Sequence, residues 1–277
     1  MSRKEKNWWI VAGVAIAIYA LAPIAWIVSL SFKAPADIAN ASFLPSSPTT
    51  SNYAQIITGD ASGLFLPALR NSFGICLIAT LISCILAMFA AYAIARLEFP
   101  GKKFILSSAL AVAIFPVISI VTPLFNLWRN IGLYDTWPGL IIPYLSLTLP
   151  LSIWTMSAFF REIPWEMEQA AQVDGATTWQ AFRKVIVPLA APGVFTTAII
   201  AFFIAWNDFA YGISLTSTSR ARPVPAALGL FSGASQFVDP TGSIAAAAVI
   251  VTIPVVVLVL IFQRRIVTGL TNGAVKG

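Results

Sequence analysis

Long apolar segments alternate with shorter polar ones along this chain. Runs of about 20 residues carry almost no charge, and each is long enough to cross a hydrocarbon layer of about 30 Å as a helix. These runs predict six membrane spans, at about 8–32, 70–95, 104–127, 138–160, 191–215 and 243–263. We therefore expect an all-α polytopic membrane protein, with residues 1–277 forming a single transmembrane domain.

Polar segments of unequal length connect the predicted spans. A connector rich in Pro, Ser and Thr fills 33–69, short turns fill 96–103 and 128–137, a mixed loop fills 216–242 and a polar tail fills 264–277. Prolines recur inside the spans, at Pro116, Pro123, Pro143, Pro150 and Pro254. Each tends to kink its helix, which suits bent helices around a path that changes shape. Prolines are also simply common in membrane helices, and that alternative stays open.

The strongly charged insert at 161–190 predicts two helices joined at a glycine. Pro164 suits a first helical turn, because its missing N–H is not needed there. Glu166 and Glu168 follow in that turn, where the positive end of the helix dipole favours acidic side chains. Gly175 can end the helix, because glycine adopts the left-handed conformation at no steric cost.

A second helix of the insert is predicted to begin at a capping box formed by Thr177 and Gln180 and to end at Pro188. It carries an apolar stripe at helical spacing, namely Trp179, Phe182 and Ile186. The small Ala170 and Ala171 on the first helix let another surface approach its backbone, so the elbow suits docking on a soluble partner. The alternative is a pair of amphipathic helices lying on lipid headgroups. The acidic residues of the first helix argue against it, because anionic lipid repels them.

Charge and composition set the orientation and exclude several classes of function. Twelve of the 17 Lys and Arg residues flank one set of span ends, so the positive-inside rule assigns that side, both termini and the insert to the cytoplasm. Because these residues lie at span ends, the net charge of +6 does not indicate a nucleic-acid partner. The absence of histidine excludes His-based metal sites, Ser–His nucleophiles and histidine proton relays.

The insert contains a sequence motif that resembles a known protein loop. A Gln-Ala-Ala triplet at 169–171 is followed by Asp-Gly-Ala at 174–176 and by Pro-Leu at 188–189. This pattern resembles the EAA loop in the membrane-spanning subunits of ATP-binding-cassette (ABC) importers, which docks on a separate ATPase. The usual Glu of that triplet is replaced by Gln169 in this chain.

The resemblance extends over nearly the whole chain. Four segments are similar to permease subunits of the MalG-like carbohydrate importers: YAIARLEFPGKK (92–103), FREIPW (160–165), AFRKVIVPLAAPG (181–193) and FQRRIVTGLTNGAVKG (262–277). Within that family the likeness is strongest to permeases of trehalose importers. It implies a type I importer fold. The residues that would couple to the ATPase are then Glu166, Glu168, Gln169, Ala170, Ala171, Asp174, Gly175 and Ala176.

The resemblance also implies partners. The chain would form half of a sugar pathway with a second homologous permease, driven by a dimer of ATPase subunits that hold ATP and Mg, and would bind no cofactor itself. An extracytoplasmic sugar-binding lipoprotein would contact the outward loop at 216–242, and the tail at 264–277 would also reach the ATPases. The sequence has no Gly-x-x-x-x-Gly-Lys-Ser/Thr loop, so we expect a non-catalytic subunit.

Sugars are bound by planar polar groups and aromatic faces, and the predicted spans offer a few of each. The candidates for the substrate path are Asn126, Trp154, Trp206, Asn207 and Asp208, with Trp128 as a further aromatic. Asp208 is the one acid predicted well inside a span, where an acid is costly and functional by default. Its alternative role is a structural hydrogen bond to a neighbouring helix. Trp128 and Trp137 also suit interfacial anchors.

Three other functions are alternatives to a permease. A secondary transporter coupled to protons or sodium usually needs several intramembrane carboxylates with histidine or lysine partners, and this chain offers Asp208 alone. An intramembrane protease needs a second intramembrane Asp or a Ser–His pair. A purely structural membrane protein leaves the two-helix elbow at 161–190 unexplained.

Overall fold

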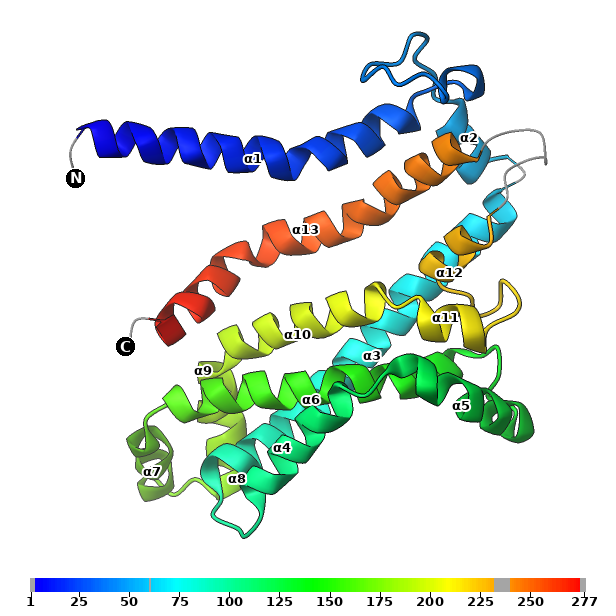
Figure 1. The fold of residues 1–277 in the computed structure, drawn as a ribbon. Helices are drawn as coiled ribbons and strands as arrows, with labels where there is room; N and C mark the ends of the chain where they lie inside the picture. The colour runs from blue at the N-terminus through cyan, green and yellow to red at the C-terminus, as the bar shows by residue number, and fades with distance from the viewer. Residues whose placement is uncertain (1–2, 60, 232–239, 275–277) are drawn as a thin grey trace. The chain divides into compact units, whose positions relative to one another are not determined.

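The computed structural model describes residues 3–59, 61–231 and 240–274, and every regular element in these ranges is a helix (Figure 1). The longer helices are α1 (Arg3–Ser31), α3 (Ser62–Arg96), α4 (Lys102–Ala113), α5 (Val117–Ile131), α6 (Trp137–Glu162), α7 (Trp165–Val173), α10 (Ala191–Trp206) and α13 (Thr241–Ala274). The shorter ones are η1 (Pro35–Asp37), α2 (Ser51–Ile57), α8 (Thr178–Ala181), η2 (Phe182–Ile186), α9 (Val187–Leu189), α11 (Ala210–Leu215) and α12 (Val224–Gly229). The predicted all-α class is confirmed.

The helices supply the predicted membrane spans. Four are long and apolar enough to cross a bilayer without a break: Asn7–Ser31, Ser62–Arg96, Trp137–Glu162 and Thr241–Phe262. Two further pairs, Lys102–Ala113 with Val117–Ile131 and Thr178–Leu189 with Ala191–Trp206, are bent by 86° and 71°. The described part of the chain therefore holds four spans, or up to six if each bent pair makes one.

The third predicted span, 104–127, is not one continuous helix. It is divided between α4 and α5, which meet at Pro116. Pro116 has an extended backbone, with φ −60° and ψ 118°, and proline disfavours the helical conformation in the residue before it. Pro123 lies inside α5 without ending it, so proline alone does not decide where a helix breaks.

The other span boundaries shift in three places. The fifth span, predicted at 191–215, is interrupted after Trp206 and resumes as α11. The last helix continues past the predicted 263, so the backbone of the expected polar tail is helical to Ala274, and 275–277 lie outside the described residues. The second span also begins earlier than predicted, because α3 starts at Ser62.

The chain divides into two compact units. One comprises Met1–Pro67 and Ala227–Pro254, and the other comprises Ala68–Ala226 and Val255–Gly277. In the first unit, Asn52 of α2 closes the end of α1, because its side-chain N–H groups donate to the carbonyl oxygens of Ser31 at 3.0 Å and Lys33 at 2.8 Å.

Lys33 is fully buried in this first unit. Its Nζ donates to the carbonyl oxygens of Asn40 at 2.7 Å and Ser42 at 2.8 Å, and it lies 5.1 Å from the ring centre of Trp26. A buried cation is tolerated when its donors are satisfied in this way. Lys33 therefore fixes the fold of the connector.

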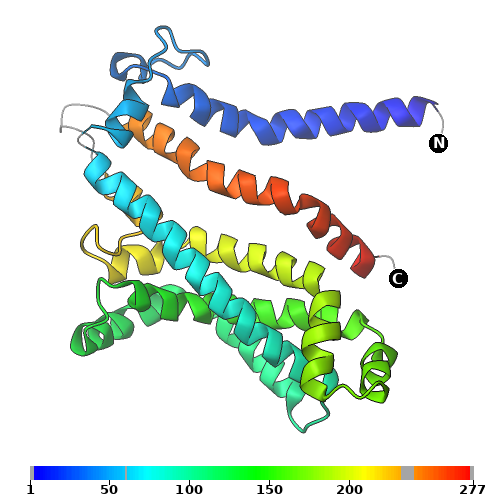
Figure 2. The same cartoon turned by 180° about the vertical axis from the view of Figure 1, so that it is seen from behind.

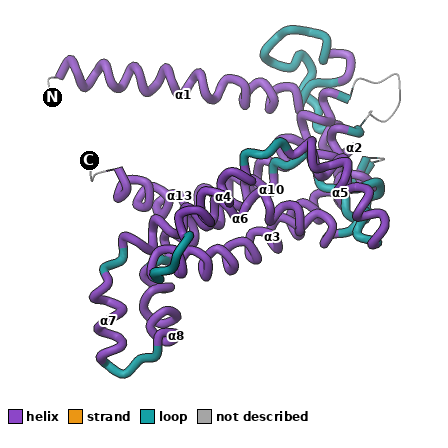
Figure 3. Tube along the Cα trace, turned by 60° about the horizontal axis from the view of Figure 1, so that its bottom comes forward, coloured by secondary structure: helices purple, strands orange, loops and turns teal. Residues whose placement is uncertain are grey.

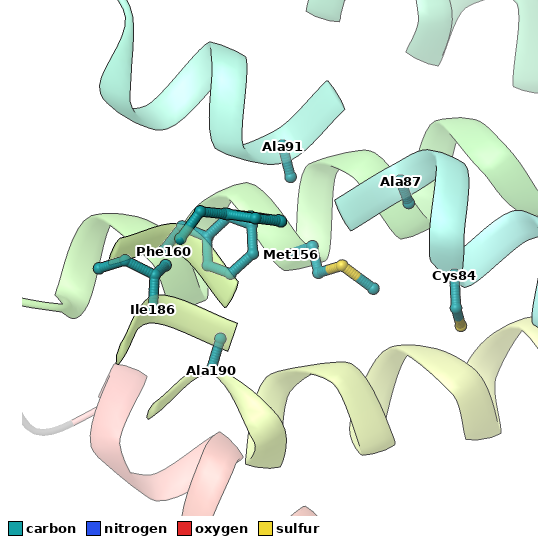
Figure 4. Packing of buried hydrophobic residues seen from close by; sticks show 8 residues of the cluster. Cys84, Ala87, Ala91, Met156, Phe160, Ile186 and Ala190 are labelled. Atoms are coloured by element: carbon teal, nitrogen blue, oxygen red, sulfur yellow. The ribbon is translucent and has the colours of Figure 1, made fainter. Parts of the chain in front are cut away.

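The second unit packs α6 beside α10, with α3 crossing both (Figures 1 and 2). Small residues allow this close approach: a Cβ added at Gly193 of α10 would lie 2.3 Å from the ring of Phe159 on α6. At one end of the unit the three helices and the second insert helix share a buried cluster of Cys84, Ala87, Ala91, Met156, Phe160, Phe182, Ile186 and Ala190. Figure 4 shows Met156 and Phe160 between the alanines of α3 and the side chains of Ile186 and Ala190.

Candidate functional site

The insert folds as the predicted elbow. Helix α7 ends at Val173, the chain turns at Gly175 with φ 88°, and α8 begins after Thr177. The capping box is present, because the Thr177 hydroxyl accepts the Gln180 N–H at 3.2 Å and the Gln180 side chain accepts the Thr177 N–H at 2.8 Å. Figure 3 shows α7 and α8 projecting past the ends of α3 and α6, joined by a short loop.

The second insert helix is rooted in the core. A π-helical turn, η2, carries Phe182 and Ile186 into the buried cluster, while Trp179 stays 57% exposed and stacks on Phe89 and Phe182 with ring centres 6.2 and 5.5 Å apart. The predicted apolar stripe is therefore buried at two of its three positions. Pro188 does not stop the helix, which ends one residue later at Leu189.

Glu168 does not face outward with the other acidic residues of α7. Its side chain is buried, and Oε1 accepts a hydrogen bond from the Tyr92 hydroxyl at 2.5 Å. Oε2 lies 3.7 Å from Nε of Arg96. That distance is too long for a hydrogen bond, so these two atoms interact through their charges. Glu168 thus joins α7 to α3, so its side chain is not part of the exposed surface of the elbow.

Arg96 completes this connection from the last turn of α3. Its Nη2 donates to the carbonyl oxygen of Ile163 at 2.7 Å, and its guanidinium carbon lies 4.7 Å from the ring centre of Trp165, close enough for a cation–π contact. Arg96 therefore touches the connection into α7, the first residue of α7 and the acid within it. We call Tyr92, Arg96 and Glu168 the latch.

Sequence reasoning missed the latch, although one signal was present. Tyr92 and Arg96 are four residues apart and so lie on one face at the end of α3. Both belong to the YAIAR segment that supported the family resemblance, but nothing local pairs them with an acid more than 70 residues later. Only the packing of α7 against α3 makes Glu168 their partner.

The remaining predicted coupling residues form the accessible part of the elbow. Exposed side chains or backbone are found at Glu166, Gln169, Ala170, Asp174 and Gly175, and partly buried ones at Ala171 and Ala176. Apart from Glu168, the predicted set is thus open to contact. Its charge is acidic and its alanines are small, so a flat or knob-like surface can reach the α7 backbone.

Asp208 of the predicted substrate path makes structural hydrogen bonds. Oδ2 accepts the hydroxyl of Tyr144 on α6 at 3.2 Å and the N–H of Gly212 at 3.0 Å, and Oδ1 lies 3.4 Å from the N–H of Tyr211. The carboxylate therefore caps the first turn of α11, which explains why the fifth span restarts here. Of the two roles left open by the sequence, these contacts supply the structural one.

The other path candidates are dispersed. Trp206 is buried and stacks on Phe202 with ring centres 5.2 Å apart, and Asn207 donates to the carbonyl oxygen of Phe203 at 2.8 Å while remaining exposed. Asn126 and Trp154 are exposed on α5 and α6. Trp206, Asn207 and Asp208 are consecutive in the sequence, and among the described residues no printed contact joins Asn126 or Trp154 to them.

Trp128 is not the exposed interfacial anchor that the sequence suggested. Its side chain is buried, and its indole Nε1 donates to the carbonyl oxygen of Gly139 at 2.7 Å. Trp137 is partly buried, and its Nε1 donates to Asn71 Oδ1 at 3.1 Å. Both residues thus hold helices together within the second unit.

Residues 83–272 match the family described as "Binding-protein-dependent transport system inner membrane component". The chain belongs to this family. Its members are inner membrane components of transport systems, and the elbow lies within the matched region.

Named relatives of this family span the whole chain. It is 56% identical over 277 residues, covering 100% of both proteins, to "Trehalose transport system permease protein SugB" of Mycobacterium tuberculosis. It is 37% identical over 269 residues to "Trehalose/maltose transport system permease protein MalG" of Thermococcus litoralis, covering 97% of this chain and 96% of that protein. The likeness therefore extends to both the first helix and the tail.

Solved structures share the fold. A crystal structure of a bacterial ABC transporter involved in the import of the acidic polysaccharide alginate contains a chain that matches with a TM-score of 0.77 at 24% identity, covering 95% of this chain and 98% of that one. A second structure, of an alginate ABC transporter in complex with an alginate pentasaccharide-bound periplasmic protein, matches with a TM-score of 0.67 at 16% identity and covers 94% of each chain. The ABC importer permease fold expected from the sequence is thereby confirmed.

Proposed function

We propose that this chain is a non-catalytic permease subunit of an ATP-driven importer for a di- or oligosaccharide, with trehalose as the first sugar to test. The full-length identity to a protein named as a trehalose permease supports the substrate. The observation that carries the mechanism is the latch, because it ties the accessible elbow rigidly to a long membrane helix.

In this proposal a separate ATPase drives the membrane part by moving α7. ATP and Mg are held by a dimer of ATPase subunits, which contacts the exposed face of α7 through Glu166, Gln169, Ala170 and Asp174. The helical tail at 264–274 is a second contact. Closure of the dimer displaces α7, and alternating access follows if nucleotide and loaded binding protein favour different states of the permease.

Two connections carry this displacement into the spans. The latch joins α7 to α3, and the side chains of Phe182 and Ile186 join the second elbow helix to the cluster formed by α3 and α6. Because packed interiors deform little, a push on the elbow moves these helices together. A loose loop would absorb the same motion without passing it on.

The side opposite the elbow supplies a surface for an extracytoplasmic sugar-binding protein. Asp135 accepts the N–H groups of Ser217 at 3.1 Å and Thr218 at 3.2 Å, and the Thr218 hydroxyl donates to its second oxygen at 2.5 Å. This stiff turn presents the exposed Arg220. Residues 232–239 of the proposed contact segment 216–242 lie outside the described residues.

A companion permease of the same family completes the pathway, and both termini of this chain face the cytoplasm. One chain encloses only part of a pathway, so sugar contacts are divided between the two permeases. On this chain Asn207 is the best-placed candidate, because it is exposed beside Asp208 at the break between α10 and α11. Asn126 and Trp154 remain weaker candidates on α5 and α6.

The decisive experiment uses the assembled transporter. The chain is co-expressed with its ATPase, companion permease and sugar-binding lipoprotein, purified and reconstituted in liposomes. ATP hydrolysis and uptake of labelled trehalose, maltose and glucose are then measured with the binding protein present. We expect ATP-dependent uptake that is stimulated most by trehalose.

Two controls decide between this proposal and an ion-coupled transporter. Liposomes carrying a hydrolysis-deficient ATPase subunit should take up no sugar. Uptake that persists there and follows an imposed proton or sodium gradient would identify a secondary transporter. Uptake that is ATP-dependent but prefers another disaccharide would keep the permease assignment and replace trehalose.

A further inference from the structure

A cavity of about 300 Å³ lies where the ends of α3, α4 and α6 meet in the second unit. Three apolar and three basic residues line it, namely Ile94, Ala95, Leu106, Lys102, Lys103 and Arg161. None of them belongs to α7 or α8 of the elbow or to the proposed sugar path, since Arg161 lies in the last turn of α6. A site that combines cations with an apolar wall suits an amphipathic ligand that has an anionic group at one end and an apolar group at the other.

The cations of this cavity are only partly neutralised. Nζ of Lys102 lies 2.8 Å from Oε1 of Glu98, so this lysine already has a partner. Within the described ranges no carboxylate lies within ion-pair distance of Lys103 or Arg161. Glu162 follows Arg161 in sequence but does not pair with it. Lys103 and Arg161 therefore carry the positive charge of the site.

The backbone adds to this charge. Helix α4 begins at Lys102 after Gly101, which provides no side-chain cap, so the first N–H groups of this 12-residue helix remain available. Their partial positive charge favours an anion near the same end of the helix as Lys103. The start of α4 therefore adds partial positive charge to the site, whereas Lys103 and Arg161 supply its full charges.

Side chains beside the lysines indicate the depth of the cavity in the membrane. Phe104 is 76% exposed and Ile105 is 52% exposed directly after Lys103. Large apolar side chains next to cations at the end of a membrane helix are typical of the boundary between headgroups and hydrocarbon. This pattern places the cations where lipid phosphates are expected, with the apolar wall on the side where acyl chains would begin.

From these observations we propose that the cavity binds the phosphate of an anionic phospholipid, with Lys103 and Arg161 holding the phosphate and Leu106 contacting the start of an acyl chain. A free phosphate ion would gain the same charge contacts but nothing from Ile94, Ala95 and Leu106. The occupant would brace the end of α3, because Ile94 and Ala95 immediately precede Arg96 of the latch.

The proposal is tested by lipid binding to the purified importer complex in detergent. Native mass spectrometry follows titration with phosphatidylglycerol, and with phosphatidylcholine as the zwitterionic comparison. We expect saturable binding of phosphatidylglycerol. The double variant Lys103→Gln/Arg161→Gln should weaken it by about 25-fold, because each basic residue near a lipid surface contributes about fivefold in affinity.

Matched variants separate charge, shape and folding. Lys184→Gln removes an exposed cation of the elbow outside the cavity and should change affinity less than twofold, as should the charge-preserving Lys103→Arg. Leu106→Trp fills the apolar side with all charges intact, and it should also weaken binding. It keeps the test decisive if the double variant does not assemble.

Three results would overturn the proposal. The first is wild-type affinity for phosphatidylglycerol in the double variant or, where the double variant does not assemble, in Leu106→Trp. The second is equal affinity for phosphatidylcholine, which would mean that charge is irrelevant. The third is full displacement of the lipid by glycerol phosphate or inorganic phosphate at the same concentration, which would identify a soluble anion as the ligand.

Discussion

Replacement of Glu168 by glutamine is the sharpest test of how the elbow is held. The change keeps the shape of the side chain and an oxygen that can accept the Tyr92 hydroxyl. It removes the charge that lies 3.7 Å from Arg96. Arg96 is then a buried cation whose remaining contacts are the Ile163 carbonyl and the Trp165 ring.

The size of the effect follows from the burial of the pair. The two side chains are 2% and 5% exposed, so solvent screens them little. Two unit charges at this separation attract by about 4 kcal/mol at an effective dielectric constant of about 20. Removal of one partner of a buried pair costs about 3–5 kcal/mol. Because Arg96 keeps two contacts, we expect about 3 kcal/mol, the low end of that range.

This cost should appear as local opening of α7. When α7 separates from α3, Arg96 becomes hydrated again. In the variant this lowers the free energy of the opened state relative to the closed state. A change of about 3 kcal/mol raises the opened population by about 100-fold. Hydrogen exchange read by mass spectrometry on the assembled complex should therefore accelerate by about that factor in 165–173, with 75–91 in α3 unchanged.

Two comparisons make the reasoning refutable. Glu162→Gln removes an exposed acid at the end of α6, outside the proposed ATPase contact, and should leave exchange in α7 near the wild-type rate. Arg96→Met combined with Glu168→Gln removes both charges and should open α7 less than Glu168→Gln alone, because no buried charge is then left unpaired. Wild-type exchange in Glu168→Gln, or faster exchange in the double variant than in the single one, would show that the charge pair does not hold the elbow.

Three further predictions concern the elbow, the helix break and the connector. Ala171→Trp and Gly175→Pro should abolish sugar-stimulated ATP hydrolysis in the reconstituted importer while leaving membrane insertion intact, and normal stimulation and uptake would argue against docking at this face. Asp208→Ala should lower the free energy of unfolding of the complex by about 1–3 kcal/mol, because two backbone N–H groups and a tyrosine hydroxyl lose their acceptor. Asp208→Asn should lower it by less. Equal decreases in the two variants would refute the capping role of Asp208. The backbone N–H and hydroxyl of Ser46 lower the pKa of Asp37. At pH values above the ordinary aspartate pKa these hydrogen bonds stabilise the connector in full, and this stabilisation is lost as the pH falls through the lowered pKa. The protection factor of the Ser46 amide, which is the intrinsic exchange rate at a given pH divided by the observed rate, should fall on acidification in the wild type and be low at every pH in Asp37→Ala. A wild-type protection factor that does not change with pH would contradict this.

The sequence pattern was sufficient to predict those features that depend on residues only a few positions apart. The elbow could be predicted because a glycine that tolerates positive φ, a reciprocal capping box and an acidic first turn each act within a few residues. In the structure Gly175 adopts a positive φ and Thr177 forms the capping box, as their positions predict. The spans likewise follow from apolar length alone, since each must cross the same hydrocarbon layer.

Long-range packing decided the points that the sequence left open or placed wrongly. Glu166 and Glu168 look alike in sequence, but α3 brings Tyr92 and Arg96 against only one of them, and that acid becomes internal. Asp208 could have been a ligand or a cap, and the position of Tyr144 on α6 supplies the structural contact.

The sequence by itself determined that the chain is a helical membrane protein with a two-helix elbow, because hydrophobic length and capping act over a few turns. Only the tertiary structure decided which side chains stay exposed and which hold the fold. The reason is physical: a charge becomes buried or exposed according to the helix that packs over it, and that neighbour lies far away in the chain. Arg96 and Glu168 are 72 positions apart in sequence and 3.7 Å apart in space.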